Sequence, residues 1–170
     1  MVRGGVRPQR RKLVWATDLF SNVTVGAGAK LPQRDLLAGL EVAGSSVLGA
    51  TIMRTHMQLA MTSAGVLVNP PGVFVGFIVN SAPTVTNLDP GVSFYDDWML
   101  NTSFSPSTNV PGNTTLVDAA SATLFWGVRI DLRSKRRIEE MGEKYWFTLS
   151  NTGAASIAVS GMTKTLLALP

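Results

Sequence analysis

Apolar and polar residues alternate through most of this chain, and this pattern predicts β-strands. The clearest example spans residues 53–61, where one face carries Met53, Thr55, Met57, Leu59 and Met61. The opposite face carries Arg54, His56 and Gln58. Such alternation is typical of a strand with one buried face and one solvent-facing face. We therefore expect the methionine face to lie in the core and His56 to lie at the surface or in an interface.

Further segments show comparable strand patterns. Residues 73–79 are apolar on both faces, which predicts a strand in the middle of a sheet with both sides covered. In residues 123–133 the positions expected to point inward are Leu124, Trp126, Val128, Ile130 and Leu132. The positions expected to point outward include Phe125, Arg129, Asp131 and Arg133. Shorter strands are predicted at 13–16, 22–25, 145–149, 157–159 and 165–169.

The number of strands decides the fold class. Two segments, 33–43 and 134–141, have helical potential, and each is short enough to form a single crossover turn. About eight strands without alternating helices favour an all-β fold, a single jelly-roll-like β-sandwich, over an α/β fold. We expect residues 1–12 to form an extended basic N-terminal arm and residues 13–170 to form one sandwich domain.

Composition excludes most catalytic and metal chemistry. The 170 residues include no cysteine and one histidine, so we expect no disulfide, no thiolate zinc site and no thiol nucleophile. We predict no catalytic residue, cofactor or metal, and therefore no enzyme. Charged residues make up 15% of the chain, below the roughly 25% of soluble domains. A surface with so few charges predicts association with copies of the chain. Without an apolar run of about 18 residues, no membrane partner is expected.

The positive charge is concentrated at the N-terminus. Five cations stand in the first twelve residues, with no acid among them: Arg3, Arg7, Arg10, Arg11 and Lys12. They exceed the net charge of +4, so the other residues sum to −1. We expect this arm to bind phosphate or an acidic protein surface, because clustered arginines favour both. The near-neutral remainder predicts no second positive surface.

A second basic cluster follows the strand predicted at 123–133. It contains Arg133, Lys135, Arg136 and Arg137, and it is balanced by Glu139, Glu140 and Glu143. Opposite charges so close in sequence favour a salt-bridge loop at a subunit interface over a nucleic-acid contact.

Several short segments carry a resemblance to known sequences. They are Arg-Arg-Lys-Leu-Val-Trp-Ala at 10–16, Asp-Leu-Leu at 35–37, Gly-Ala-Thr-Ile-Met-Arg-Thr at 49–55, Asp-Trp-Met at 97–99 and Asp-Leu-Arg-Ser-Lys-Arg-Arg at 131–137. With them the chain resembles, nearly end to end, small virion proteins of tailed phages and environmental viruses. The resemblance implies a virion β-domain of jelly-roll type, made in the host cytoplasm and located in the capsid.

Three roles are compatible with that fold. We favour the first, because the five cations of the arm are few beside the charge of a packaged genome and the rest of the chain sums to −1. The first is a structural cement or decoration subunit, most simply a trimer, that binds a capsid shell protein through the arm and stabilises the shell. The second is a sole shell-forming coat protein whose arm binds nucleic acid. The third is a carbohydrate-binding module, in which Tyr95, Trp98 and Phe104 near the long 101–113 loop face a ligand. Fold alone does not separate these roles.

Overall fold

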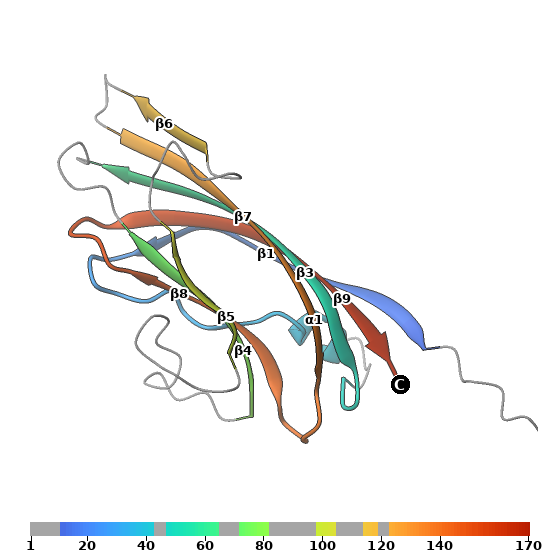
Figure 1. Ribbon diagram of the computed structural model, residues 1–170. Coiled ribbons are helices and arrows are strands. Elements are labelled where there is room, and N and C mark those ends of the chain that lie inside the picture. Colours follow the sequence, from blue (N-terminus) through green and yellow to red (C-terminus); the bar gives the residue numbers. More distant parts are fainter. Residues whose placement is uncertain (1–10, 43–46, 65–71, 82–97, 105–113, 119–122) are drawn as a thin grey trace, which may run out of the picture.

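The computed structural model describes residues 11–42, 47–64, 72–81, 98–104, 114–118 and 123–170. Within these ranges the chain forms nine strands and one short helix, arranged as two antiparallel sheets that face each other (Figure 1). The larger sheet has the order β1-β9-β3-β7-β6. Its strands are β1 (Lys12–Val25), β9 (Ile157–Leu169), β3 (Thr51–Ala64), β7 (Thr123–Arg137) and β6 (Thr114–Asp118).

The smaller sheet has the order β2-β8-β4-β5. Its strands are β2 (Arg34–Asp35), β8 (Lys144–Asn151), β4 (Val73–Asn80) and β5 (Trp98–Phe104). The chain passes from one sheet to the other at every connection except those between β4 and β5 and between β6 and β7. This connectivity is that of a double-sheet jelly roll. The prediction of an all-β, jelly-roll-like sandwich is confirmed.

The core lies between the two sheets and follows the predicted faces. On β3, Thr55, Met57, Leu59 and Met61 are buried, whereas Met53 is half-buried because the register shifts between Ile52 and Arg54. The inward residues of β7 that are buried are Trp126, Val128 and Ile130. Strand β4 is buried on both faces over most of its length. Its two edges pair with β8 and β5.

One hydrogen bond crosses the core from sheet to sheet. The Thr55 Oγ1 on β3 lies 2.9 Å from the Tyr145 Oη on β8, and both residues are completely buried. Burial raises the pKa of Tyr145 above its ordinary value, because the phenolate would lose its hydration. The phenol therefore stays protonated. The ring also packs against Phe77, with centroids 5.9 Å apart.

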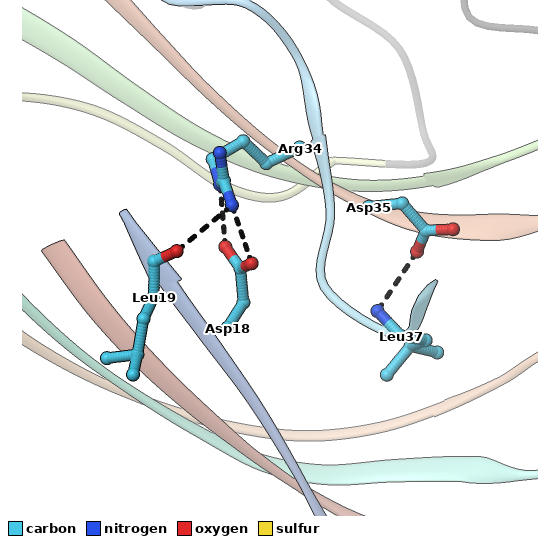
Figure 2. Close-up of polar contacts among 5 residues, drawn as sticks. All are labelled: Asp18, Leu19, Arg34, Asp35 and Leu37. Carbon is cyan, nitrogen blue, oxygen red and sulfur yellow. Dashed lines mark hydrogen bonds and ion pairs between the residues drawn. The ribbon is translucent and has the colours of Figure 1, made fainter. Parts of the chain in front are cut away.

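An ion pair joins the two sheets along the β1 and β2 edges (Figure 2). The Arg34 Nε and Nη2 each donate to a carboxylate oxygen of Asp18 at 2.7 Å, and Arg34 Nη2 also donates to the Leu19 carbonyl at 3.3 Å. The Asp18 carboxylate raises the pKa of Arg34. Beside this pair, Asp35 Oδ1 accepts the backbone N–H of Leu37, which precedes the helix. These groups fasten the crossover from β1 to β2.

Both predicted helical segments differ from the structure. In the first, only α1 (Ala38–Val42) is helical, and residues 34–35 form β2. In the second, residues 134–137 continue β7, and the helix prediction is wrong. The reason is long-range pairing: Arg136 lies opposite Ile52 and Arg137 opposite Thr51, so the long partner strand β3 holds this segment extended.

The two predicted N-terminal strands form one continuous strand, β1. Its register with β9 shifts between Phe20 and Val23, where Asn22 adopts a φ of 51°. The Asn22 amide donates to the Ser160 Oγ at 2.9 Å. Asparagine tolerates this left-handed backbone better than most residues, so it fits the irregular position.

Candidate interaction surface

Only the end of the predicted arm belongs to the described residues. Arg3, Arg7 and Arg10 lie outside them, whereas Arg11 and Lys12 are described and exposed. Lys12 is already the first residue of β1 and pairs with Leu169. What the arm binds stays a prediction.

The second basic cluster is a strand, not a loop. Arg133, Lys135, Arg136 and Arg137 all belong to β7, because this strand stays paired with β3 to its last residue. Glu139 and Glu140 follow in the turn before β8, and both are exposed. Their backbone N–H groups donate to Glu143 Oε2 at 2.6 and 3.0 Å.

The expected charge balance of this cluster is limited to one arginine. Arg136 Nη2 lies 3.6 Å from Glu143 Oε1, and Glu143 is almost fully buried. By contrast, Arg133, Lys135 and Arg137 are exposed. Of the described carboxylates, none lies within ion-pair distance of Lys135 or Arg137. The two acidic residues after the strand therefore do not neutralise it.

Strand register collects the exposed cations on the outer face of the larger sheet. Side chains alternate along each strand, so the residues opposite the buried ones share this face. Three rows of outward residues cross the strands β9, β3 and β7 in that order. They are Leu166–Arg54–Arg133, Lys164–His56–Asp131 and Met162–Gln58–Arg129. The cations of this face are Arg54, Arg129, Arg133, Lys135, Arg137 and Lys164.

This cationic face contradicts the expectation that the body carries no second positive surface. On the four strands β1, β9, β3 and β7 of this face, Asp131 is the single acid at an outward position, and Asp118 lies at the far end of the face on β6, opposite Thr123. Arg54 donates to both oxygens of that carboxylate, at 2.8 and 2.6 Å, and lowers the pKa of Asp131. The Nδ1 of His56 lies 3.4 Å from the same carboxylate. The Asp131 carboxylate is thus already paired with Arg54 and lies beside His56.

The β1 edge of the same face is apolar. Leu13, Trp15 and Leu19 are 62%, 51% and 66% exposed, and we call them the apolar row. They stand at outward positions of β1, where Trp15 lies opposite Leu166 and Leu19 opposite Met162 of β9. The Trp15 ring stacks on the His56 ring, with centroids 6.3 Å apart and planes at 23°. The face therefore passes from apolar at β1 to cationic at β7.

A shallow hollow of about 400 Å³ opens on this face. Small residues of three neighbouring strands, Ser160, Ala60 and Gly127, form one row of its lining. Gln58, Arg129 and Met162 belong to the adjoining row and also line it. The hollow results from missing side-chain volume in the sheet surface.

The aromatic residues named for the carbohydrate-binding alternative do not form a described site. Phe104, named for the carbohydrate alternative, packs partly buried against the core. Tyr95 and the side chain of Trp98 lie outside the described residues. In the described part of the chain, no group of three or more histidine, aspartate or glutamate side chains is placed to hold a metal ion. No helix there is long and apolar enough to span a membrane.

Comparison with known proteins gives similarity in structure only. No protein-family model and no curated protein matches the chain. A chain of Desmodium yellow mottle tymovirus matches with 10% identity and a TM-score of 0.38, covering 100% of this chain and 94% of its own length. A chain of the empty head of turnip yellow mosaic virus matches with 10% identity and a TM-score of 0.41, over 100% of this chain and 87% of that one. A chain of cocksfoot mottle virus matches with 10% identity and a TM-score of 0.38, over 99% of this chain and 89% of that one. At these values the similarity does not establish a shared function.

Sequence reasoning missed half of the surface. The strand patterns place Arg129, Arg54 and Trp15 on separate strands and do not group them, and they do not assign Lys164 to a face. The available signal was that each stands at an outward position of its strand. Which outward positions become neighbours depends on strand order, and the separate strand patterns do not contain it.

Proposed function

We propose that this chain is a structural virion protein, a jelly-roll subunit that associates with copies of itself in a capsid. The observation that carries the proposal is the apolar row. Three large apolar side chains stand more than half exposed on one edge strand, in a chain with few charged residues. Such a patch marks an interaction site on a soluble protein.

The first version of this role is a cement or decoration subunit. The subunit binds a shell formed by another capsid protein and stabilises it. It does so as a trimer, the smallest ring that a head-to-tail contact between copies can close. In this version the basic arm, including Arg11 and Lys12, contacts carboxylates of the shell protein. The subunit is made in the host cytoplasm and ends in the virion.

The second version is a shell-forming coat protein. The cationic outer face favours it, because a coat protein must offset packaged phosphate charge with more than a short arm. Arm and face together supply a larger positive charge than the arm alone. The face weakens the argument that led us to prefer cement from the sequence.

Self-association tests the proposal directly. The purified chain is expected to form oligomers at micromolar concentration in analytical ultracentrifugation. Replacing two members of the apolar row, Leu13→Ser with Leu19→Ser, should shift it toward monomer. The matched control is Leu48→Ser with Met141→Ser, which removes two apolar side chains exposed elsewhere and should leave association unchanged. A strictly monomeric chain, or equal effects of the two double variants, would refute the proposed role of the row.

Electron microscopy separates the two versions. A coat protein alone should form closed particles, whereas a cement subunit should remain a small oligomer and bind only to shells of another protein. Assembly of the isolated chain into closed particles would exclude the cement role.

A further inference from the structure

We propose that the outer face of the larger sheet binds single-stranded nucleic acid. In this site the cations of β7 and its neighbours contact phosphates, and Trp15 stacks on a base. This inference goes beyond the structural role proposed above. Trp15 also belongs to the apolar row, so binding is measured at nanomolar protein concentration, below the micromolar range in which we expect copies of the chain to associate through that row.

The first argument is the arrangement of charge. Outward side chains of a strand recur about every 6.8 Å, twice the rise per residue, so Arg129, Arg133, Lys135 and Arg137 form a line along β7. Arg54 and Lys164 extend the positive surface across β3 and β9. On β9, β3 and β7 these six cations therefore share the face with one carboxylate, that of Asp131. A continuous positive track of this kind follows a phosphate backbone.

The second argument is the exposed aromatic pair. Half of the Trp15 surface is open to solvent, and its ring already stacks on His56 at the centre of the face. Unpaired bases stack on exposed aromatic rings whatever their identity, and sheet faces that bind single strands use this combination of aromatics and cations. A duplex hides the faces of its bases, so the tryptophan favours a single strand as the ligand.

The simplest structural explanation accounts for only part of this surface. Charged residues on an edge strand prevent sheets from pairing edge to edge. Among the described residues, only the short strand β6 pairs with the side of β7 that faces away from β3. That explanation applies to the β7 cations. It does not apply to Lys164 and Arg54, which lie on interior strands, and it gives no reason for an exposed tryptophan on β1.

The test compares three triple variants of the full-length chain. The face variant is Arg133→Gln, Lys135→Gln and Arg137→Gln. The arm variant is Arg3→Gln, Arg7→Gln and Arg10→Gln, which removes the same charge. The control variant adds three negative charges at exposed turn positions away from the face: Ala27→Glu, Ala154→Glu and Ser156→Glu. Binding to a labelled oligouridine of roughly 16 nucleotides is measured by anisotropy over a series of salt concentrations.

The salt dependence gives the decisive number. Each phosphate contact on a single strand contributes about 0.7 to the slope of log affinity against log salt. The face variant should therefore reduce the slope by about 2, and the control variant should leave it unchanged. Equal effects of face and control variants, or loss of slope in the arm variant alone, would overturn the proposal. So would equally strong competition by polyglutamate, which would indicate an acidic protein partner.

Tryptophan fluorescence tests the stacking contact separately. Oligouridine should quench the fluorescence of the full-length chain, and Trp15→Phe should abolish the Trp15 part of the quenching while binding persists. Trp15→Ala should weaken binding roughly tenfold, because a stacked base is lost. Urea unfolding checks that both variants remain folded. Unchanged quenching in Trp15→Phe would show that no base stacks at this position. These measurements need no particle, and at protein concentrations where the chain is monomeric their outcome does not depend on association through the apolar row.

Discussion

The hydrogen bond between Thr55 and Tyr145 connects the two sheets through the centre of the core, and it allows a sharp test of the packing. Thr55→Val keeps the side-chain shape and removes the hydroxyl. The Tyr145 Oη then loses its partner at a site with no solvent access. An unsatisfied buried hydroxyl costs about 1–3 kcal/mol in unfolding free energy. Tyr145→Phe should cost a similar amount by leaving the Thr55 hydroxyl unpaired.

The double variant distinguishes this mechanism from a general loss of packing. With both hydroxyls removed, neither partner is left unsatisfied, and the phenyl ring that Tyr145→Phe introduces can still pack against Phe77 as the tyrosine ring does. The double variant should therefore lose less unfolding free energy than the two single variants together, by about 1 kcal/mol or more. Urea unfolding at fixed protein concentration measures all four proteins, and their m-values should agree.

Alkaline pH provides a second readout of the same group. The pKa of Tyr145 is higher in the folded chain than in the unfolded chain. Its contribution is complete below the unfolded pKa of about 10 and is lost as pH rises above it, since only the unfolded tyrosine ionises there. Tyr145→Phe should remove this part of the alkaline decline. Additive costs of the single variants within about 0.5 kcal/mol, or an unchanged alkaline decline in Tyr145→Phe, would refute the reasoning.

Two further predictions test the assigned faces of the larger sheet. Met57→Asp should abolish folding, because a buried unpaired carboxylate costs several kcal/mol, whereas Gln58→Asp should be tolerated at its exposed position. Equal thermal melting of these variants would show that the faces are wrong. Gly161→Ala should cost about 1–3 kcal/mol, because its Cβ would lie 2.5 Å from Phe20 Cζ and 2.9 Å from Leu59 Cδ2. Adding Phe20→Leu should recover part of that cost, and a Gly161→Ala variant as stable as the parent chain would contradict the close packing.

The core of this fold is predictable because a strand with one buried face alternates apolar and polar residues along its sequence. The alternation around Met57 and around Val128 identifies the inward faces, and the structure buries both residues. The pattern fails where a strand departs from regular pairing. Met53 is half-buried at a register shift, and Asn22 marks another irregularity within β1. A single inserted residue changes the face of its neighbours, and local composition does not reveal it.

The end of β7 shows the complementary limit. Arg136 and Arg137 stand in a segment of good helix formers, and local propensity favours a helix there. Pairing with Ile52 and Thr51, more than eighty positions earlier in the chain, keeps the segment extended. Tertiary pairing thus overrides a weak local preference, and it turns a predicted interface loop into a charged strand face.

Net charge gave a misleading view of the surface because it ignores where each charge is used. Three acids of the body are occupied by inward or edge contacts: Asp18 with Arg34, Asp35 with Lys144, and Glu143 with Arg136 and two backbone amides. They cancel cations in the sum, yet they lie apart from the outer face of the larger sheet. A ligand at that face meets the field of the nearby side chains, since ions in solution screen charges beyond about 10 Å. A body with a net charge of −1 can therefore present a cationic surface. The order of the strands determines which charged side chains lie together and hence the local charge at the ligand.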